Sequence, residues 1–277
     1  MSKMVNILDE ILFIKQPYEF ETITKKAKSF HVLYNGNSII RDNIFLVLEN
    51  YARKEKISLN ILRYPFKDDE LWVFSFLKEG NVFVCINLDL ALNKQIFATA
   101  HELYHIYCYI NEDNQTLLKS GSLLDSTTAD EIGKTQEDLE ANAFAGLLLI
   151  PELLLKEEIE LFDIQCEKIT LDDILILMDI FAVPFKAMIL RLFECKLINK
   201  KQVYQFMRLD AQTILKRSQI TGKAKRWMVE DNRISSFGNL EENLQFNIDN
   251  DLLLDSRLES DIEYLDKLKK EFDIKKV

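Results

Sequence analysis

Residues 101–105 read HELYH and lie within an apolar stretch, residues 95–110. Residues four apart share one face of a helix, so the imidazoles of His101 and His105 can reach the same metal ion. Glu102, next to the first of these ligands, then faces a water molecule bound to that ion. The pattern predicts zinc-dependent hydrolysis on a helix, with two histidine ligands and a catalytic glutamate.

The motif stands out because the chain has three histidines, and two of them bracket a glutamate at the spacing that zinc ligation requires. Apolar side chains surround the motif on nearly every side of the expected helix, which predicts a buried helix. Buried imidazoles and carboxylates are costly unless they are paired or metal-bound. We therefore favour a metal site over a surface helix with a chance histidine pair. The third histidine, His31, is interpreted as a structural or surface residue.

A catalytic zinc ion usually takes three protein ligands and leaves a fourth position for water. The third ligand is expected in residues 136–151, which read QEDLEANAFAGLLLIP in a helical pattern. On this helix Asp138 shares a narrow face with small and apolar residues, whereas Glu140 points almost to the opposite side. Glu137 lies about a quarter turn from Asp138 and could also be directed inward. Asp138 is the first choice for the third ligand, and Glu137 is the alternative.

Two segments together, residues 95–105 (QIFATAHELYH) and 140–151 (EANAFAGLLLIP), resemble the ImmA/IrrE family of metallopeptidases. The resemblance covers roughly residues 40–200 and implies a zinc site in which two helices supply two histidines and one acidic ligand. Several members are encoded beside a helix-turn-helix repressor that they cleave or inactivate. The resemblance therefore implies a protein substrate, a repressor of a mobile element or stress response that is encoded nearby.

Two positions depart from the family pattern. The acidic ligand usually stands four residues before the asparagine, and here that position holds Asp138 rather than glutamate. Asp138 is one methylene shorter, so either the helices approach more closely or Glu137 takes over. Tyr104 occupies a position where the family commonly has glycine, and we expect it to narrow or decorate the cleft. Asn142, one turn after Asp138, either orients a ligating histidine through a hydrogen bond or packs as an amide between helices.

The ligand set determines the expected chemistry. Zinc lowers the pKa of bound water toward neutrality and polarises the scissile carbonyl, and Glu102 transfers the proton to the leaving amine. Manganese and iron also suit two histidines and a carboxylate. The alternative function is a non-catalytic module on a metallopeptidase scaffold, for instance a toxin, antitoxin or regulator that sequesters a partner.

The composition is that of a globular protein: 277 residues, of which 48% are hydrophobic and 29% charged. The net charge of -10 argues against nucleic acid as a direct ligand, because phosphate binding relies on a basic surface. A basic cluster at residues 216–226 is interpreted as a solvated face. Four scattered cysteines predict reduced thiols. Without a recognisable signal peptide or an apolar run of membrane-spanning length, we expect a cytoplasmic protein with no membrane partner.

Residues 41–56 predict an amphipathic helix. Three β-like runs follow it, at residues 57–64, 71–77 and 82–87. The turn residues Glu-Gly-Asn at 79–81 predict an antiparallel hairpin of the second and third runs. In zinc peptidases of this kind, an edge strand of such a sheet often holds the substrate backbone.

Residues 111–135 are polar and predict a long loop over the cleft. Residues 171–181 and 185–193 predict two helices joined by a tight turn, with helix-turn-helix character. The second helix has few basic side chains, so packing or partner docking is its expected role. Residues 237–277 predict one or two further helices.

Together these elements predict an α+β fold, in which a mostly helical, zincin-like metallopeptidase core with a small antiparallel sheet is followed by C-terminal helices. The expected domains are an N-terminal helical segment (1–40), the core (41–165), the helix-turn-helix-like segment (166–200) and a C-terminal helical region (201–277).

Overall fold

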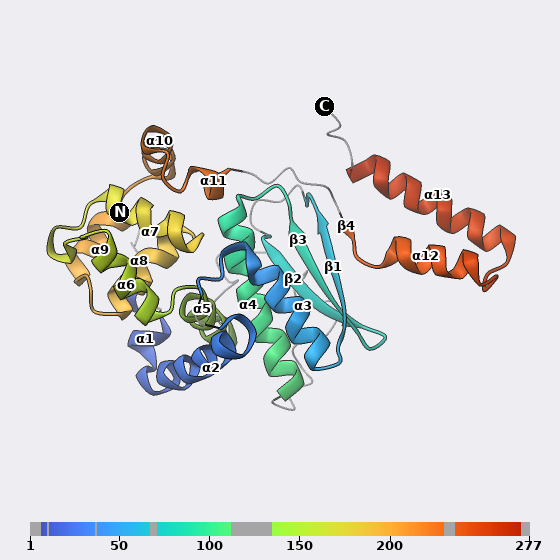
Figure 1. Ribbon diagram of the computed structural model, residues 1–277, viewed down its shortest axis with the longest axis horizontal. Helices are drawn as coiled ribbons and strands as arrows, with labels where there is room; N and C mark the ends of the chain where they lie inside the picture. Colours follow the sequence, from blue (N-terminus) through green and yellow to red (C-terminus); the bar gives the residue numbers. More distant parts are fainter. Residues whose placement is uncertain are drawn as a thin grey trace.

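The computed structural model describes residues 7–9, 11–36, 38–66, 71–111, 135–229 and 236–272. Its strands are β1 (Ser58–Tyr64), β2 (Val73–Lys78), β3 (Asn81–Asn87) and β4 (Ser236–Phe237). Its helices are α1 (Leu12–Lys15), α2 (Pro17–Asn35), α3 (Ile44–Lys54), α4 (Leu92–Asn111), α5 (Gln136–Leu149), α6 (Glu152–Leu161), α7 (Leu171–Phe181), α8 (Phe185–Glu194), α9 (Lys200–Met207), α10 (Ala211–Thr221), α11 (Lys225–Met228), α12 (Leu240–Asp249) and α13 (Asp255–Phe272). The predicted α+β fold class is confirmed, and α3 and α4 lie across one face of the sheet (Figure 1).

The sheet has the strand order β2-β3-β1-β4. Strands β2 and β3 form the predicted antiparallel hairpin, with Lys78 opposite Asn81. The two residues of its turn, Glu79 and Gly80, both have positive φ, which is why a glycine suits this position. The sheet as a whole is mixed rather than antiparallel, because β3 lies between β2 and β1 and runs parallel to β1.

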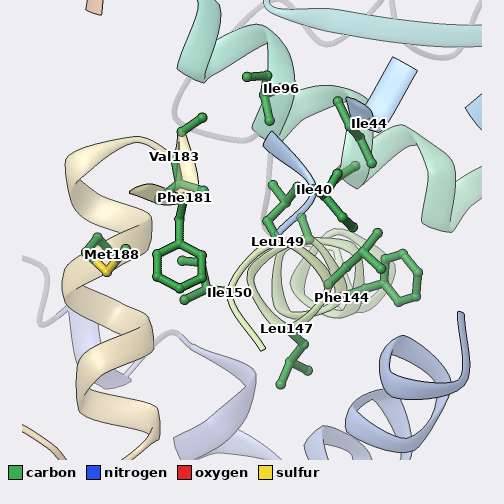
Figure 2. Packing of buried hydrophobic residues seen from close by; sticks show 14 of the residues in the cluster. Ile40, Ile44, Ile96, Phe144, Leu147, Leu149, Ile150, Phe181, Val183 and Met188 are labelled. Carbon is green, nitrogen blue, oxygen red and sulfur yellow. The ribbon is translucent and has the colours of Figure 1, made fainter. Parts of the chain in front are cut away.

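Helix α5 lies between the sheet side of the protein and helices α6 to α9 (Figure 1), and its side chains meet apolar neighbours in several directions (Figure 2). Phe144, Leu148 and Leu149 have at most 1% of their surface exposed. Helices α2, α4 and α8 all pack against α5. A helix that is apolar nearly all round is stable only when it is enclosed in this way. The packing fixes the position of α5 relative to α4, which carries the HELYH motif.

Helices α7 and α8 confirm the predicted pair joined by a tight turn. The turn contains Ala182, which has a left-handed conformation. Thr170 and Asp173 form a capping box at the start of α7. In the basic cluster, Arg217 makes two hydrogen bonds to Asp172 of α7, so part of the positive charge is neutralised within the protein.

At the C-terminal end, α12 and α13 pack against each other and extend away from the body beyond β4 (Figure 1). Two helices were among the predicted possibilities for this region. Nearly all of the predicted loop at residues 111–135 lies outside the described residues. Among the helices that are described, none combines the length and the apolar character needed to cross a membrane.

Candidate metal centre

The two histidines of the HELYH motif lie side by side on α4. Their Nε2 atoms are 3.0 Å apart, and their ring centroids are separated by 4.8 Å. The side chains of His101 and His105 are 18% and 15% exposed, so both rings are largely shielded from bulk solvent. A helix turn brings residues i and i+4 to the same face, which produces this arrangement.

The opposite ring nitrogens both have oxygen partners on α5. His101 Nδ1 lies 3.1 Å from Asn142 Oδ1, and His105 Nδ1 is hydrogen-bonded to Glu137 Oε1. Because both partners are acceptors, the hydrogen-bond network assigns a proton to each Nδ1. Both Nε2 lone pairs then point toward one shared space. Histidines that bind metals are usually held by such a hydrogen bond on their other nitrogen.

Asp138 completes the group from the first turn of α5. Its Oδ1 lies 3.8 Å from His101 Nε2 and 3.7 Å from His105 Nε2. The point equidistant from these three atoms is about 2.0 Å from each, which matches zinc–nitrogen and zinc–oxygen bond lengths. The donor set therefore fits a divalent cation such as zinc.

Thr135, the N-cap residue of α5, holds Asp138 in place. Its hydroxyl donates to Asp138 Oδ2 at 2.5 Å and accepts a hydrogen bond from the backbone N–H of Asp138 at 3.1 Å. The second carboxylate oxygen of Asp138 is thus occupied, and Oδ1 remains directed at the histidines. This N-cap position could have been recognised from the sequence, because a threonine three residues before an acidic residue is a common start of a helix.

Glu102 lies beside the histidines and is 6% exposed. One of its oxygens and one nitrogen of each histidine all lie within 4.8 Å of one another. The hydroxyl of Ser75, on β2, donates to Glu102 Oε2 at 2.5 Å. Burial raises the pKa of Glu102, whereas the charge of His105 and the hydrogen bonds from Ser75 act in the opposite direction. The carboxylate is held in place and close to the space between the histidines.

The two histidines titrate differently. Burial, and then the nearby His105, lower the pKa of His101. Burial also acts against a charge on His105, but the hydrogen bond with Glu137 and the nearby carboxylates outweigh it and raise the pKa of His105. A cation between the Nε2 atoms would therefore compete with a proton on His105, as metals generally do at histidine sites.

Tyr104 does not border the cleft, contrary to expectation. It has no exposed surface, and its hydroxyl donates to Glu140 Oε2 at 2.8 Å. Its ring lies 5.2 Å from that of Phe144. Because residue 104 lies between the two histidines along a turn of α4, its side chain points to the core side of the helix. Tyr104 and Glu140 instead join α4 to α5 behind the site.

The structure brings together all the residues expected at the site, namely His101, Glu102, His105, Glu137, Asp138 and Asn142. Sequence reasoning missed Ser75 and Thr135, which hold the two carboxylates. Ser75 has no local signal, because it lies 27 residues from Glu102 along the chain.

Comparison with known families identifies a match that covers the candidate centre. The profile of the IrrE N-terminal-like domain, Peptidase_M78, matches residues 54–193, which is half of the chain. The matched region contains β1 to β3 and α4 to α7, and therefore every residue of the candidate centre. No curated protein matches the chain.

Proposed function

Since this chain belongs to the metallopeptidase family of the IrrE N-terminal-like domain, we propose that it is a zinc-dependent endopeptidase that hydrolyses a peptide bond in a protein regulator. The observation that carries the proposal is the convergence of two Nε2 atoms and one carboxylate oxygen at separations of 3.0, 3.7 and 3.8 Å. These separations are short enough for three ligands of one zinc ion.

We assign His101, His105 and Asp138 as the ligands. Glu137 is assigned to His105 Nδ1, and Asn142 to His101 Nδ1, where each keeps its histidine in the tautomer that offers Nε2. Glu137 is the weaker candidate for the third ligand because its Oε1 is already bound to the far side of the His105 ring. Manganese or iron could occupy the same ligand set.

A bound divalent cation supplies a Lewis acid that polarises the scissile carbonyl and makes water acidic near neutral pH. Glu102 is the general base: it accepts the proton of the attacking water and passes it to the leaving amine. Ser75 keeps the Glu102 carboxylate directed at the reaction space through the 2.5 Å hydrogen bond. Burial of Glu102 keeps bulk water from competing for that carboxylate.

The proposed substrate is a helix-turn-helix repressor encoded nearby, as the resemblance implies. Strand β2 is at the edge of the sheet formed by the described strands, and its Ser75 contacts Glu102. An extended substrate segment could pair with this edge and place its backbone beside the metal centre.

The test combines metal content with cleavage. Mass spectrometry of the purified protein should find one zinc per chain, and His101→Ala should reduce it. Co-incubation with the repressor encoded beside this chain should produce discrete fragments. Glu102→Gln should retain zinc and lose cleavage, because it removes the base and leaves the ligands.

Two results would overturn the proposal: a protein without stoichiometric metal, or a repressor that behaves identically with the wild type and with Glu102→Gln. If Glu102→Gln instead retained full regulatory function by binding alone, the chain would be a non-catalytic binding module on the peptidase scaffold.

A further inference from the structure

A cavity of about 290 Å³ lies next to the metal centre, between α1, α5 and α8. Its walls are mainly apolar and include Ile11, Trp72, Phe97, Leu139 and Leu190. Ligand pockets in proteins span roughly 300–1,000 Å³ and have this apolar character. The cavity thus has room for a single large side chain rather than for an extended ligand.

The cavity borders the candidate centre at Asn142. Asn142 forms part of its wall and also bonds to His101 at 3.1 Å. Phe97, another wall residue, precedes His101 by one turn of α4, and Leu139 follows Asp138 directly on α5. A group that fills the cavity therefore lies against Asn142, the hydrogen-bond partner of His101.

Gly146, which lines the cavity, is a second observation that the cavity is open. It lies in the interior of α5 with ordinary helical geometry, where glycine is less favourable than alanine. A Cβ atom built on Gly146 would have no protein atom within 4 Å, so packing within the described chain does not require glycine there. Because Gly146 has no side chain, the cavity that it lines is larger.

The two buried polar side chains of the cavity, Arg191 and Glu194, are partnered within the protein. Arg191 Nη1 lies 3.2 Å from Glu194 Oε2, with side chains that are 5% and 9% exposed. Arg191 Nε also donates to the backbone oxygen of Ile150 at 3.0 Å. An occupant therefore meets apolar walls and an already paired floor, which favours an apolar group over a charged one.

We propose that this cavity is a specificity pocket that takes one large apolar side chain, such as leucine or phenylalanine, from the polypeptide substrate next to the scissile bond. The inference rests on the proposed peptidase function and adds a substrate preference to it. Gly146 is the specificity-determining residue, because any side chain at this position would occupy the pocket.

The first test uses the metal-free protein and two probes, N-acetyl-L-phenylalaninamide and N-acetylglycinamide, followed by two-dimensional NMR. The phenylalanine probe should shift the amide signals of Gly146 and Leu190, and the glycine probe should not. Equal responses to both probes would overturn the inference. Shifts that depend on protein concentration rather than on probe would assign the cavity to a second copy of the chain, which would also overturn it.

The second test uses the zinc-loaded protein and hydroxamates, which chelate metals. Acetohydroxamate binding reports on the metal centre alone. N-acetyl-leucine hydroxamate should bind about tenfold or more tightly than the glycine derivative, since it buries a leucine side chain. If acetohydroxamate fails to bind, the proposed function fails, and the NMR experiment still decides the pocket.

Gly146→Leu is the matched variant. It should abolish the advantage of the leucine hydroxamate and leave acetohydroxamate binding unchanged, because the substitution fills the cavity without touching a ligand. Gly146→Ala should have a smaller effect. Neither variant should lower the melting temperature, since both remove a helix-interior glycine. A leucine advantage that persists in Gly146→Leu would refute the assignment of the pocket.

Discussion

Separate replacement of Asp138 and Glu137 tests their proposed roles, in which Asp138 binds the metal and Glu137 orients His105. Asp138→Asn removes the charged ligand whose Oδ1 lies 3.7 and 3.8 Å from the two Nε2 atoms. Glu137→Gln keeps an oxygen that can accept the hydrogen bond from His105 Nδ1. The two changes remove the same charge from the same helix turn, so long-range electrostatics are matched between them.

The expected losses differ in size. A group that orients a metal-binding histidine is worth about 10–100-fold in metal affinity, and Glu137→Gln should fall within or below that range. In the proposed site Asp138 would supply one of the three protein contacts with the metal, so Asp138→Asn should cost more than about 100-fold in zinc affinity, or roughly 3 kcal/mol.

Zinc affinity can be measured by competition with a chromophoric chelator at fixed pH and ionic strength. The melting temperature of each metal-free variant serves as the folding control. If Glu137→Gln weakened zinc binding more than Asp138→Asn in folded protein, the ligand and the orienting group would be exchanged, and the reading of the three distances would be wrong.

Three further changes probe the surroundings of the site. Ser75→Ala should leave zinc content unchanged and lower kcat about 10–100-fold, because Glu102 loses its 2.5 Å hydrogen bond; an unchanged kcat for repressor cleavage would contradict this role. Burial raises the pKa of Glu194 to about 7 against its ordinary 4.5, with Arg191 opposing. Folding therefore favours the protonated form of Glu194. The stability that the wild type has at low pH is fully present below pH 4.5, and part of it is lost as the pH rises toward 7. In urea unfolding between pH 4.5 and 7, the free energy of unfolding should fall less for Glu194→Gln than for the wild type, by up to a few kcal/mol. Parallel pH dependences of the two proteins would contradict this role of Glu194. Phe144→Ala should destabilise the chain by about 3–5 kcal/mol, measured by the same unfolding, because this ring is 1% exposed; a loss below 1 kcal/mol would contradict its place in the core.

Much of the fold could be predicted from local sequence patterns. The helix around the HELYH motif, the hairpin of β2 and β3 and the pair of α7 and α8 each depend on residues that are close in sequence. The parallel pairing of β1 with β3 was not predicted, because it depends on where β3 inserts relative to a strand that is distant along the chain. Strand order is a tertiary property that periodicity alone does not determine.

At the candidate site, too, local patterns predict which residues face inward, whereas their exact partners depend on tertiary packing. A helical wheel indicates that Glu137 and Asp138 both face inward but not which nitrogen each one meets. That difference arises from the distance between α4 and α5, which side-chain packing sets. The prediction that Tyr104 narrows the cleft was wrong for a related reason. In the family pattern a glycine leaves this side of the helix without a side chain, whereas here the Tyr104 ring packs in the core against Phe144.

The packing of α4 against α5 is consistent with the proposed use of an aspartate as third ligand, at a position where the resemblance implies glutamate. Asp138 is followed on its own face of α5 by Ala141 and Ala145, which have no exposed surface and add little bulk between the helices. Thr135 fixes the short carboxylate from the other side. With its rotamer held by the N-cap, this short carboxylate places Oδ1 3.8 Å from His101 Nε2 and 3.7 Å from His105 Nε2. Asp138→Glu should therefore weaken zinc binding, because the added methylene would shift the carboxylate away from its hydrogen bond with Thr135 and from its present distance to the histidines; tighter binding by this variant would contradict the proposed role of Asp138.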